Sequence, residues 1–193
     1  NLLPINQLAR ITTILPVEAE EETWEDLQIF FATSTGNVRK NALSDFTNVK
    51  ANGKIAMKLP ENTTLIGAQI CKNDNDVLLT TAKGKAIRFQ VDAIRVFASR
   101  ASKGVRGMKL GKGDEVMSMS ILKREAEDAQ GQALLCVSEK GMGKRTYASE
   151  YRTIGRGGQG VVNMKLTEKT GDVVATFPVT DDHQVMLISD AGQ

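Results

Sequence analysis

The chain has 193 residues, 41% of them hydrophobic, and a formal net charge of +2. This length and composition fit one large folded domain or two small ones and exclude a disordered or fibrous protein. The sequence has no apolar run of about eighteen residues, no signal peptide and no transit sequence, so we expect a soluble cytoplasmic protein without membrane contact. The chain starts at Asn1 without Met, so we also expect a piece of a longer protein.

Two cysteines, Cys71 and Cys136, and one histidine, His183, are too few for a tetrahedral zinc site. Free cysteine behaves as a small buried hydrophobe, so we expect both thiols to be reduced and buried. The sequence offers few candidate residues for nucleophilic catalysis, because it has no G-x-S-x-G motif and no Cys/His signature. We therefore expect no catalytic residue, no metal and no cofactor in this chain.

An internal repeat organises the sequence. Three full copies and two partial ones are present, at residues 27–70, 76–121, 133–179, 1–17 and 184–193. The copies share a glycine at the same point, at Gly36, Gly84, Gly141 and Gly192, with spacings of 48 to 57 residues. The full copies also share a Met-Lys-Leu triplet, at residues 57–59, 108–110 and 164–166.

Each full copy predicts four short strands. The first is a nearly continuous apolar run, at residues 29–33, 77–81 and 134–138, which is typical of a strand buried on both faces. The shared glycine follows at a hairpin position that favours positive φ. The Met-Lys-Leu segment predicts a third strand, as at residues 161–166, and the last strand is the apolar stretch at residues 65–70, 116–121 and 173–179.

Four strands per unit with a period near fifty residues are typical of propeller blades, whose sheets bury their faces against their neighbours. No window shows a strong helical period with caps. We therefore predict an all-β, propeller-like array of about four blades, with a blade incomplete at each end of the chain.

Charge follows the repeat. Residues 35–59, 83–110 and 140–166 hold 19 of the 25 basic residues and only three acids, a net +16, whereas the rest of the chain carries −14. Because equivalent segments occupy equivalent places in a repeat array, this pattern predicts a basic stripe that binds a polyanion along the outer rim. Nine aromatic residues are too few to stack the bases of a single strand, so we expect phosphate contacts with double-stranded DNA and little sequence preference.

The predicted DNA-contacting residues are cations of these three stretches. They are Arg39, Lys40, Lys50, Lys54, Lys83, Lys85, Arg88, Arg95, Arg100, Lys103, Arg106, Lys144, Arg145, Arg152 and Arg156.

A glycine loop at residues 155–160 fits G-x-G-x-x-G, but a strand rather than a helix is expected after it, which argues against a dinucleotide site. Two interpretations of this loop stay open. Gly157, Gly158 and Gly160 either let backbone amides approach phosphate beside Arg156, which we favour, or form a tight crossing between blades.

Acidic residues gather in the connections between copies, at residues 18–26 and 123–131. Each run taken alone is most simply a solvated loop. Their recurrence in register with the repeat leads us to expect that they keep DNA off one face of the array.

Several motifs resemble the C-terminal domain of the DNA gyrase A subunit. They are A-T-x-x-G-x-V-[RK]-K at residues 32–40, A-S-[KR]-G-V-R-G-M-K-L at residues 101–110 and G-M-G-K-R-T at residues 141–146. The resemblance covers essentially the whole chain. It implies a β-pinwheel, whose blades exchange a strand with their neighbours and wrap double-stranded DNA around a basic rim.

The resemblance also implies the surroundings of such a domain. These are a gyrase A N-terminal domain and a gyrase B subunit in an A2B2 complex that introduces negative supercoils in the bacterial cytoplasm, on the chromosome. ATP and magnesium belong to other parts of that complex, and neither Tyr147 nor Tyr151 is expected to be catalytic.

Two alternatives stay open. The family's Q-[RK]-R-G-G-[RK]-G box is expected in an upstream blade, and residues 156–160 match it only in part, so the topoisomerase IV A subunit remains a near alternative. A propeller used as a protein-interaction scaffold is the other, although lysine is depleted at the centres of protein interfaces.

Overall fold

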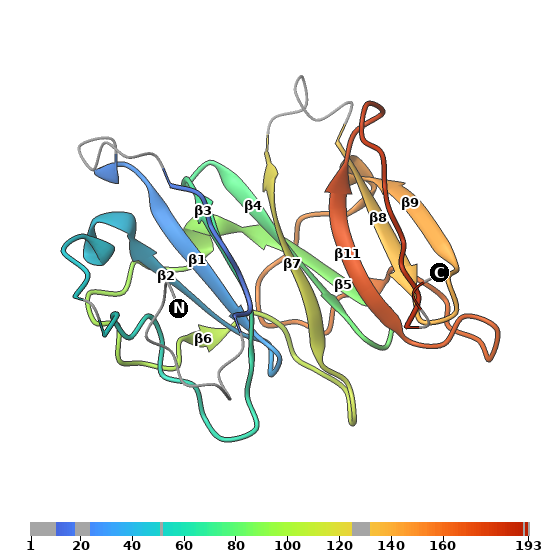
Figure 1. Cartoon of the computed structure of the whole chain (residues 1–193), viewed down its shortest axis with the longest axis horizontal. Helices are drawn as coiled ribbons and strands as arrows, with labels where there is room; N and C mark the ends of the chain where they lie inside the picture. Colours follow the sequence, from blue (N-terminus) through green and yellow to red (C-terminus); the bar gives the residue numbers. More distant parts are fainter. Residues whose placement is uncertain (1–10, 18–23, 51, 125–131, 191, 193) are drawn as a thin grey trace.

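The computed structural model of the chain describes residues 11–17, 24–50, 52–124, 132–190 and 192 (Figure 1). These residues form β-strands and short 3-10 turns and contain no α-helix. The strands make three sheets that lie side by side, which confirms the predicted all-β, propeller-like fold.

The first sheet, blade 1, has the order β3-β1-β2-β6 and takes strands from two copies of the repeat. Its strands are Gln28–Thr33 (β1), Asn37–Ala42 (β2), Leu65–Cys71 (β3) and Val105–Arg106 (β6). The first three belong to one copy and are antiparallel neighbours. The short β6 comes from the next copy and pairs with the start of β2, so adjacent copies exchange a strand.

Blade 2 repeats this arrangement with the order β10-β5-β4-β7. Its strands are Asn75–Thr81 (β4), Lys85–Gln90 (β5), Val116–Lys123 (β7) and Val161–Val162 (β10). Here β10 comes from the third copy and pairs with β5.

Blade 3 has three strands in the described residues, in the order β11-β8-β9. They are Ala133–Ser138 (β8), Gly143–Tyr147 (β9) and Val173–Val179 (β11). The partial copies form no strand within residues 11–17 and 184–190. The second strand of each copy leads into a 3-10 turn, and these turns are Leu43–Phe46 (η2), Val91–Ala93 (η3) and Ala148–Glu150 (η4).

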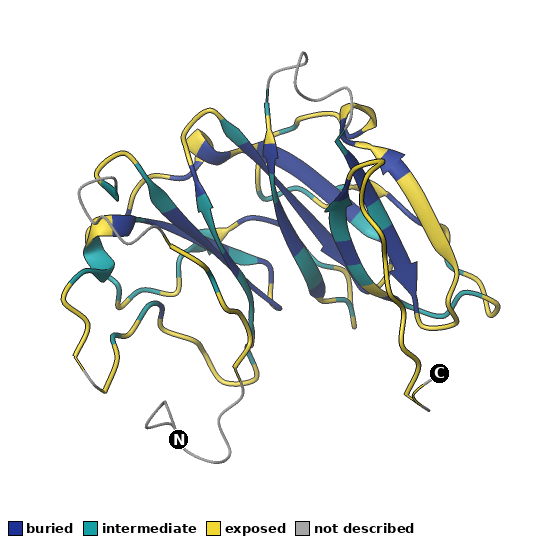
Figure 2. Ribbon diagram, turned by 45° about the horizontal axis from the view of Figure 1, so that its top comes forward, coloured by how far each residue is buried: buried dark blue, intermediate teal, exposed yellow. Residues whose placement is uncertain are grey.

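The first strand of each copy lies at the centre of its sheet and is buried along most of its length, as predicted (Figure 2). The hairpin glycines that follow have positive φ, at +80° for Gly36, +76° for Gly84 and +75° for Gly141. A side chain is excluded at Gly84 for a second reason, because a Cβ there would lie 2.3 Å from the main-chain oxygen of Met164.

The Met-Lys-Leu segments are not strands, so that prediction was wrong. In the third copy only Val161 and Val162 are extended and paired, and the triplet itself lies beyond them. The chain instead turns against the previous hairpin: the amide of Met108 donates to the oxygen of Gly36, and the amide of Met164 donates to that of Gly84, both at 3.1 Å. A buried methionine thus anchors each of these copies to the preceding blade.

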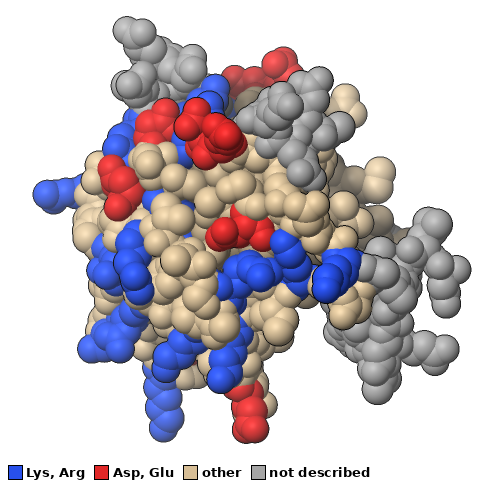
Figure 3. Space-filling model, turned by 90° about the vertical axis from the view of Figure 1, so that its left-hand side faces the viewer, with Lys and Arg blue, Asp and Glu red and all other residues tan. Residues whose placement is uncertain are grey.

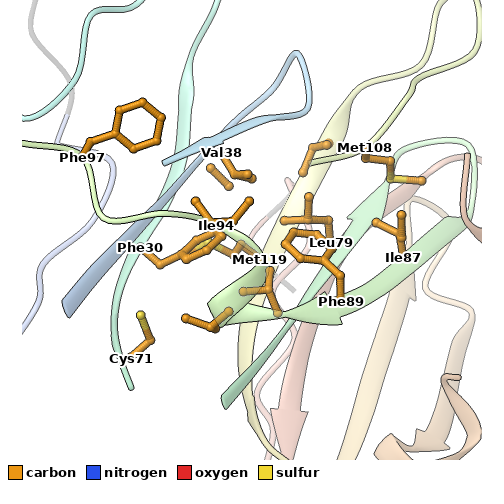
Figure 4. Packing of buried hydrophobic residues seen from close by; sticks show 14 residues of the cluster. Phe30, Val38, Cys71, Leu79, Ile87, Phe89, Ile94, Phe97, Met108 and Met119 are labelled. Atoms are coloured by element: carbon orange, nitrogen blue, oxygen red, sulfur yellow. The ribbon is translucent and has the colours of Figure 1, made fainter. Parts of the chain in front are cut away.

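The largest core cluster joins blades 1 and 2 (Figure 4). Phe30 of β1 and Phe89 of β5 face each other with ring centroids 6.4 Å apart, and Leu79 of β4 packs in the same layer. Cys71 lies in this cluster, and both cysteines are free and buried, as predicted. Burial raises the pKa of the Cys71 thiol to about 12, so it stays protonated at neutral pH.

Candidate nucleic-acid interface

Cationic segments occupy the outer edge of the array. Strand β7 packs against β3 on one side and β11 on the other, so these strands form the edges at which the blades converge. The opposite edge of blades 1 and 2 is formed by β6 and β10. The cation-rich residues 91–110 and 148–166 run along that edge, and Figure 3 shows Lys and Arg spread widely over the face at the blade 1 end.

In blade 1 the outer edge is built by a segment of the second copy, residues 96–106. Val96 bridges to Lys40, and the amide of Phe97 donates to the Lys40 oxygen at 2.8 Å. The segment then crosses blade 1 and ends in β6. The second copy therefore places three of its cations on blade 1, which is otherwise built by the first copy. These cations are Arg100, Lys103 and Arg106.

Blade 2 is completed in the same way by residues 153–162 of the third copy. Thr153 bridges to Arg88, and the amide of Ile154 donates to the Arg88 oxygen at 2.9 Å. This segment carries Arg156, and Arg152 directly precedes it. Arg152 occupies the same repeat position in the third copy as Arg95 does in the second. The two segments are therefore equivalent in their cations as well as in their main-chain contacts.

The predicted cations fall into three groups by exposure. Those on the surface are Lys50, Lys83, Arg95, Lys103, Arg106, Lys144, Arg145, Arg152 and Arg156. Those of intermediate exposure are Lys54, Lys85 and Arg100, and those that are buried are Arg39, Lys40 and Arg88.

The burial of Arg39, Lys40 and Arg88 contradicts their predicted place on an exposed rim. Their relative exposures are 0%, 2% and 8%, and each side chain binds main-chain oxygens inside the array. Burial lowers the pKa of both Arg39 and Lys40, because desolvation disfavours the charged form. These three side chains hold blades together and cannot reach a duplex on the surface.

Some of the exposed and half-exposed cations are already paired within the protein. Lys83 forms an ion pair with Asp172 at 2.7 Å, and the hydrogen bond to this carboxylate raises the pKa of Lys83. Lys54 and Lys144 donate to main-chain oxygens, the latter to Asn163 at 3.1 Å. These residues keep a positive charge at the surface, but a carboxylate compensates that of Lys83.

The glycine loop at residues 155–160 packs against the preceding copy. The Gly157 amide donates to the Gly107 oxygen at 2.6 Å, and the Gly158 oxygen accepts from the Lys109 amide at 2.8 Å. A Cβ at Gly160 would lie 2.3 Å from the Ala86 oxygen. This geometry is that of the tight crossing between blades, and it engages the Gly157 amide that we expected to approach phosphate.

Arg156 links the glycine loop to the surface of the second copy. Its Nη1 donates to the Arg106 oxygen at 3.0 Å and its Nε donates to the Ala93 oxygen at 3.3 Å, while the side chain stays exposed. A guanidinium fixed in this way has lost part of its rotational freedom before any ligand arrives.

The predicted set omitted the lysines of the Met-Lys-Leu triplets. The triplet lysine is exposed in each full copy, as Lys58, Lys109 and Lys165. The main-chain amides of Lys58 and Lys109 also donate to the loop of the next copy. The sequence held the signal for them, because each triplet places a cation between a methionine and a leucine at the same point of each full copy.

Among the described residues, a metal-binding cluster and a membrane-spanning helix are both absent. No group of three or more His, Cys, Asp or Glu side chains there could hold a metal ion. Within the same residues no helix is long and apolar enough to cross a membrane. The acidic connections at residues 18–26 and 123–131 lie largely outside the described residues, because residues 18–23 and 125–131 are not among them.

Comparison with protein families gives a match for all three full copies. The model of the DNA gyrase C-terminal domain, beta-propeller, matches residues 28–72, 75–123 and 132–180. The chain belongs to the DNA gyrase C-terminal domain family. Within this family, the exchanged strands β6 and β10 agree with the pinwheel that the motifs implied.

Gyrase A proteins match this family member over its whole length. The DNA gyrase A subunit of Salmonella typhimurium is 42% identical over 192 residues, and that of Rickettsia bellii is 38% identical over an alignment of 235 residues. Each alignment covers 100% of this chain but only 21% and 26% of the respective relatives. The chain thus spans about a quarter of the length of these relatives.

Solved structures give the same result. A DNA gyrase A C-terminal domain superposes with a TM-score of 0.71 and 30% identity, covering 82% of this chain and 50% of that one. The C-terminal domain of a DNA topoisomerase IV has a TM-score of 0.80 at 19% identity, over 93% of this chain and 54% of that one, which shows a shared fold.

Proposed function

We propose that this chain binds double-stranded DNA along its cationic outer edge and curves the duplex around it, with little sequence preference. The observation that carries the proposal is the recurrence of exposed or half-exposed cations at equivalent positions of successive copies. They are Arg95 and Arg152, Arg100 and Arg156, and the triplet lysines Lys58, Lys109 and Lys165. A polyanion that follows the edge meets the same charges at each blade.

Curving is part of the proposal because the contacts repeat from blade to blade. Bending a site of twenty to thirty base pairs costs on the order of 1–6 kcal/mol, which several phosphate contacts can offset. A duplex held at one blade only would gain no such compensation.

The wider role proposed for the chain is that of the DNA-wrapping part of a gyrase A protein in an A2B2 complex with gyrase B. There the wrap would present DNA for the introduction of negative supercoils in the bacterial cytoplasm, with ATP hydrolysed on the gyrase B protein. The two gyrase A relatives, at 42% and 38% identity, support gyrase over topoisomerase IV.

Replacing Arg100, Lys103 and Arg106 together by Ala tests the DNA-binding proposal in the full-length protein. We expect weaker duplex binding and a log-log salt dependence that is flatter by up to about three units, at roughly 0.9 per lost phosphate contact. The matched control replaces Lys72, Lys112 and Lys169, three exposed lysines outside the cationic stretches, and should change the slope less. Unchanged DNA affinity in the first variant would sink the proposal and favour a protein-interaction scaffold.

Duplex length tests the curving separately. We expect a long linear duplex to bind more tightly than a short one, with the difference shrinking as salt rises. Equal affinity for the two lengths would limit the contact to one blade and remove the wrap from the proposal.

A further inference from the structure

Two junctions on the outer edge are built from the same repeat positions and can be compared residue by residue. Junction 1 brings Lys54 and Ile55 of the first copy against residues 99–101 of the second. Junction 2 brings Arg106 of the second copy against residues 155–157 of the third. Ile55 and Arg106 are equivalent, because each is the second residue after a glycine with positive φ.

An arginine stands at the same place in both junctions, but only one of the two is bound to the protein. Arg100 and Arg156 each lie four residues before the positive-φ glycine of their loop. Arg156 donates through Nη1 to the Arg106 oxygen and through Nε to the Ala93 oxygen. Within the described part of the chain, Arg100 makes no hydrogen bond and no ion pair.

This difference changes what each arginine can offer to a phosphate group. The Arg156 side chain is ordered in advance, but the single hydrogen of its Nε is already used. It therefore cannot form the two-point contact that pairs Nε with a neighbouring nitrogen. Arg100 keeps all of its donors for a ligand.

A hollow of about 350 Å³ lies beside Arg100 at junction 1, lined by Lys54, Ile55 and residues 99–101. Its walls combine positive charge, the hydroxyl of Ser99 and the apolar side chain of Ile55, which is 72% exposed. A phosphodiester group with its deoxyribose has matching surfaces, since its oxygens accept hydrogen bonds and its sugar is partly apolar. The hollow therefore fits one backbone unit of DNA.

The exposure of Ile55 is a property of its place in the repeat. Val162 stands at the same place in the third copy, on the four-stranded sheet of blade 2, and is 70% exposed. Arg106 is exposed there as well. An apolar side chain at this place thus remains on the surface even when its blade is complete.

A buried charge lies under junction 1. Arg39 Nη1 donates to the main-chain oxygen and the hydroxyl of Ser102, directly after the residues that line the hollow. Burial is the main cause that lowers the pKa of Arg39; Asp45 opposes it, and the charge of Arg100 lowers the pKa further. The two guanidinium groups are therefore close enough to interact. The second copy has Ile87 at the position of Arg39, so no such charge lies under junction 2.

We propose that junction 1 is a binding site for one phosphodiester group of the duplex and holds DNA more tightly than junction 2 does. This inference rests on the proposed function. Arg100 donates two parallel N–H bonds to the phosphate oxygens, and Ile55 contacts the deoxyribose. Ser99 donates its hydroxyl, whose oxygen already accepts from the Ala101 amide at 3.2 Å. The duplex is thus held unequally along the edge, with its firmest contact between the first two copies.

Substitutions at the equivalent arginines test this site in the full-length protein, with the long linear duplex as probe. We expect Arg100→Ala to weaken binding about tenfold or more, as for a lost charge-assisted hydrogen bond, and the matched control Arg156→Ala about threefold at most. Arg100→Lys should restore only part of the affinity, because an ammonium group cannot form the same planar pair of bonds. Arg100→Ala should keep the urea unfolding midpoint of the wild type, because it removes no internal hydrogen bond.

Ile55→Ser separates the apolar contact from the charges. We expect it to weaken binding about threefold, because an apolar contact with the sugar is lost. Its log-log salt slope should equal that of the wild type, whereas Arg100→Ala should flatten the slope by roughly 0.9. Val162→Ser is the matched control, because this residue is equally exposed at the same repeat position but does not line the hollow, and it should change neither quantity.

The outcomes distinguish the site from the proposed function. Equal losses for Arg100→Ala and Arg156→Ala would overturn the site at junction 1 and leave DNA binding along the edge in place. Wild-type affinity in Ile55→Ser, or an equal loss in Val162→Ser, would overturn the sugar contact. A wild-type protein that does not bind the duplex would overturn the proposed function and this site with it.

Discussion

The Arg39 guanidinium donates a 2.7 Å hydrogen bond to the main-chain oxygen of Ser102, 63 residues further along the chain. The same group binds the Asn41 side chain at 2.7 Å and lies 5.2 Å from the centroid of the Phe97 ring. A buried charge in blade 1 thus fixes the segment that carries the half-exposed Arg100 and the exposed Lys103.

The first prediction follows from this anchor. Arg39→Ala should lower the free energy of unfolding in urea by about 1–3 kcal/mol, because it leaves buried acceptors without their donor. Hydrogen exchange at residues 96–106 should rise at the same time. Arg95→Ala is the control, since Arg95 is exposed and its guanidinium lies over the same Phe97 ring, 4.5 Å from the centroid. Equal losses for the two variants would contradict the anchoring role.

Asp76 gives the second prediction. This fully buried carboxylate accepts from Arg88 at 2.8 Å, Arg124 at 3.1 Å and Thr153 at 3.2 Å. Asp76→Asn should cost about 3–5 kcal/mol in urea unfolding, because Arg88 would keep a buried charge without its counter-ion. Asp92→Asn removes an exposed carboxylate 3.5 Å from the same Arg124 and should cost less than about 1 kcal/mol. A cost for Asp76→Asn as small as that of the control would show that water compensates the site.

Gly84 and Gly141 provide a matched pair for the third prediction. Both have φ near +75°, but a Cβ at Gly84 would lie 2.3 Å from the Met164 oxygen, whereas a Cβ at Gly141 would meet nothing within 4 Å. Gly141→Ala should cost about 1–2 kcal/mol through its backbone alone. Gly84→Ala should cost about 3 kcal/mol or more, because the contact between copies must also open. The urea unfolding midpoints of the two variants measure this difference. Similar midpoints would show that the contact between Gly84 and the Met164 oxygen adds no steric cost.

The fourth prediction concerns pH. Burial raises the pKa of the Cys71 thiol from 9.0 to about 12, so the unfolded chain loses this proton at lower pH than the folded chain does. Between pH 9 and 12, loss of this proton therefore stabilises the unfolded state relative to the folded state. The free energy of unfolding should fall by at most about 1.4 kcal/mol per pH unit from this group. Below pH 9 it should contribute no slope.

Cys71→Ala isolates that contribution, because Cys136 remains. The variant should show a flatter decline above pH 9 than the wild type, whatever its stability at neutral pH. A thiol reagent at pH 8 should also label Cys71 slowly in the folded chain. Identical slopes for the two proteins would mean that Cys71 ionises as readily in the fold as in the unfolded chain.

The sequence predicts the parts of this fold that depend on local pattern. The apolar runs around Phe31, Leu79 and Cys136 are the central strands, and Gly36 and Gly84 sit in hairpins with positive φ, because both signals lie within a few residues. The exchanged strands have no such signal. Strands β6 and β10 are two residues long, and Arg106 finds its partner Asn37 nearly seventy residues away, a distance at which spacing alone gives no register.

Charge counting predicted the cationic edge but could not sort its members. Lys40 and Arg145 are the same kind of residue at the same repeat position, yet one is buried under the next blade and the other is exposed. In a stack of sheets both faces of a strand are covered. The alternation of side chains between the two faces of β2 therefore does not distinguish Arg39 from a surface cation. Only the neighbouring blade determines which cations remain free for a ligand.

The exchange of strands sets an order in which the chain can complete itself during synthesis. Blade 1 has three of its strands once Cys71 is made, but its fourth strand and the segment over Arg39 arrive only with Arg106. At about 5–20 residues per second, the ribosome needs roughly two to seven seconds to add the residues between them. During that interval the outer edge of β2 is unpaired. Blades 1 and 2 are each closed by the copy translated after them, so their folding trails synthesis by most of one repeat.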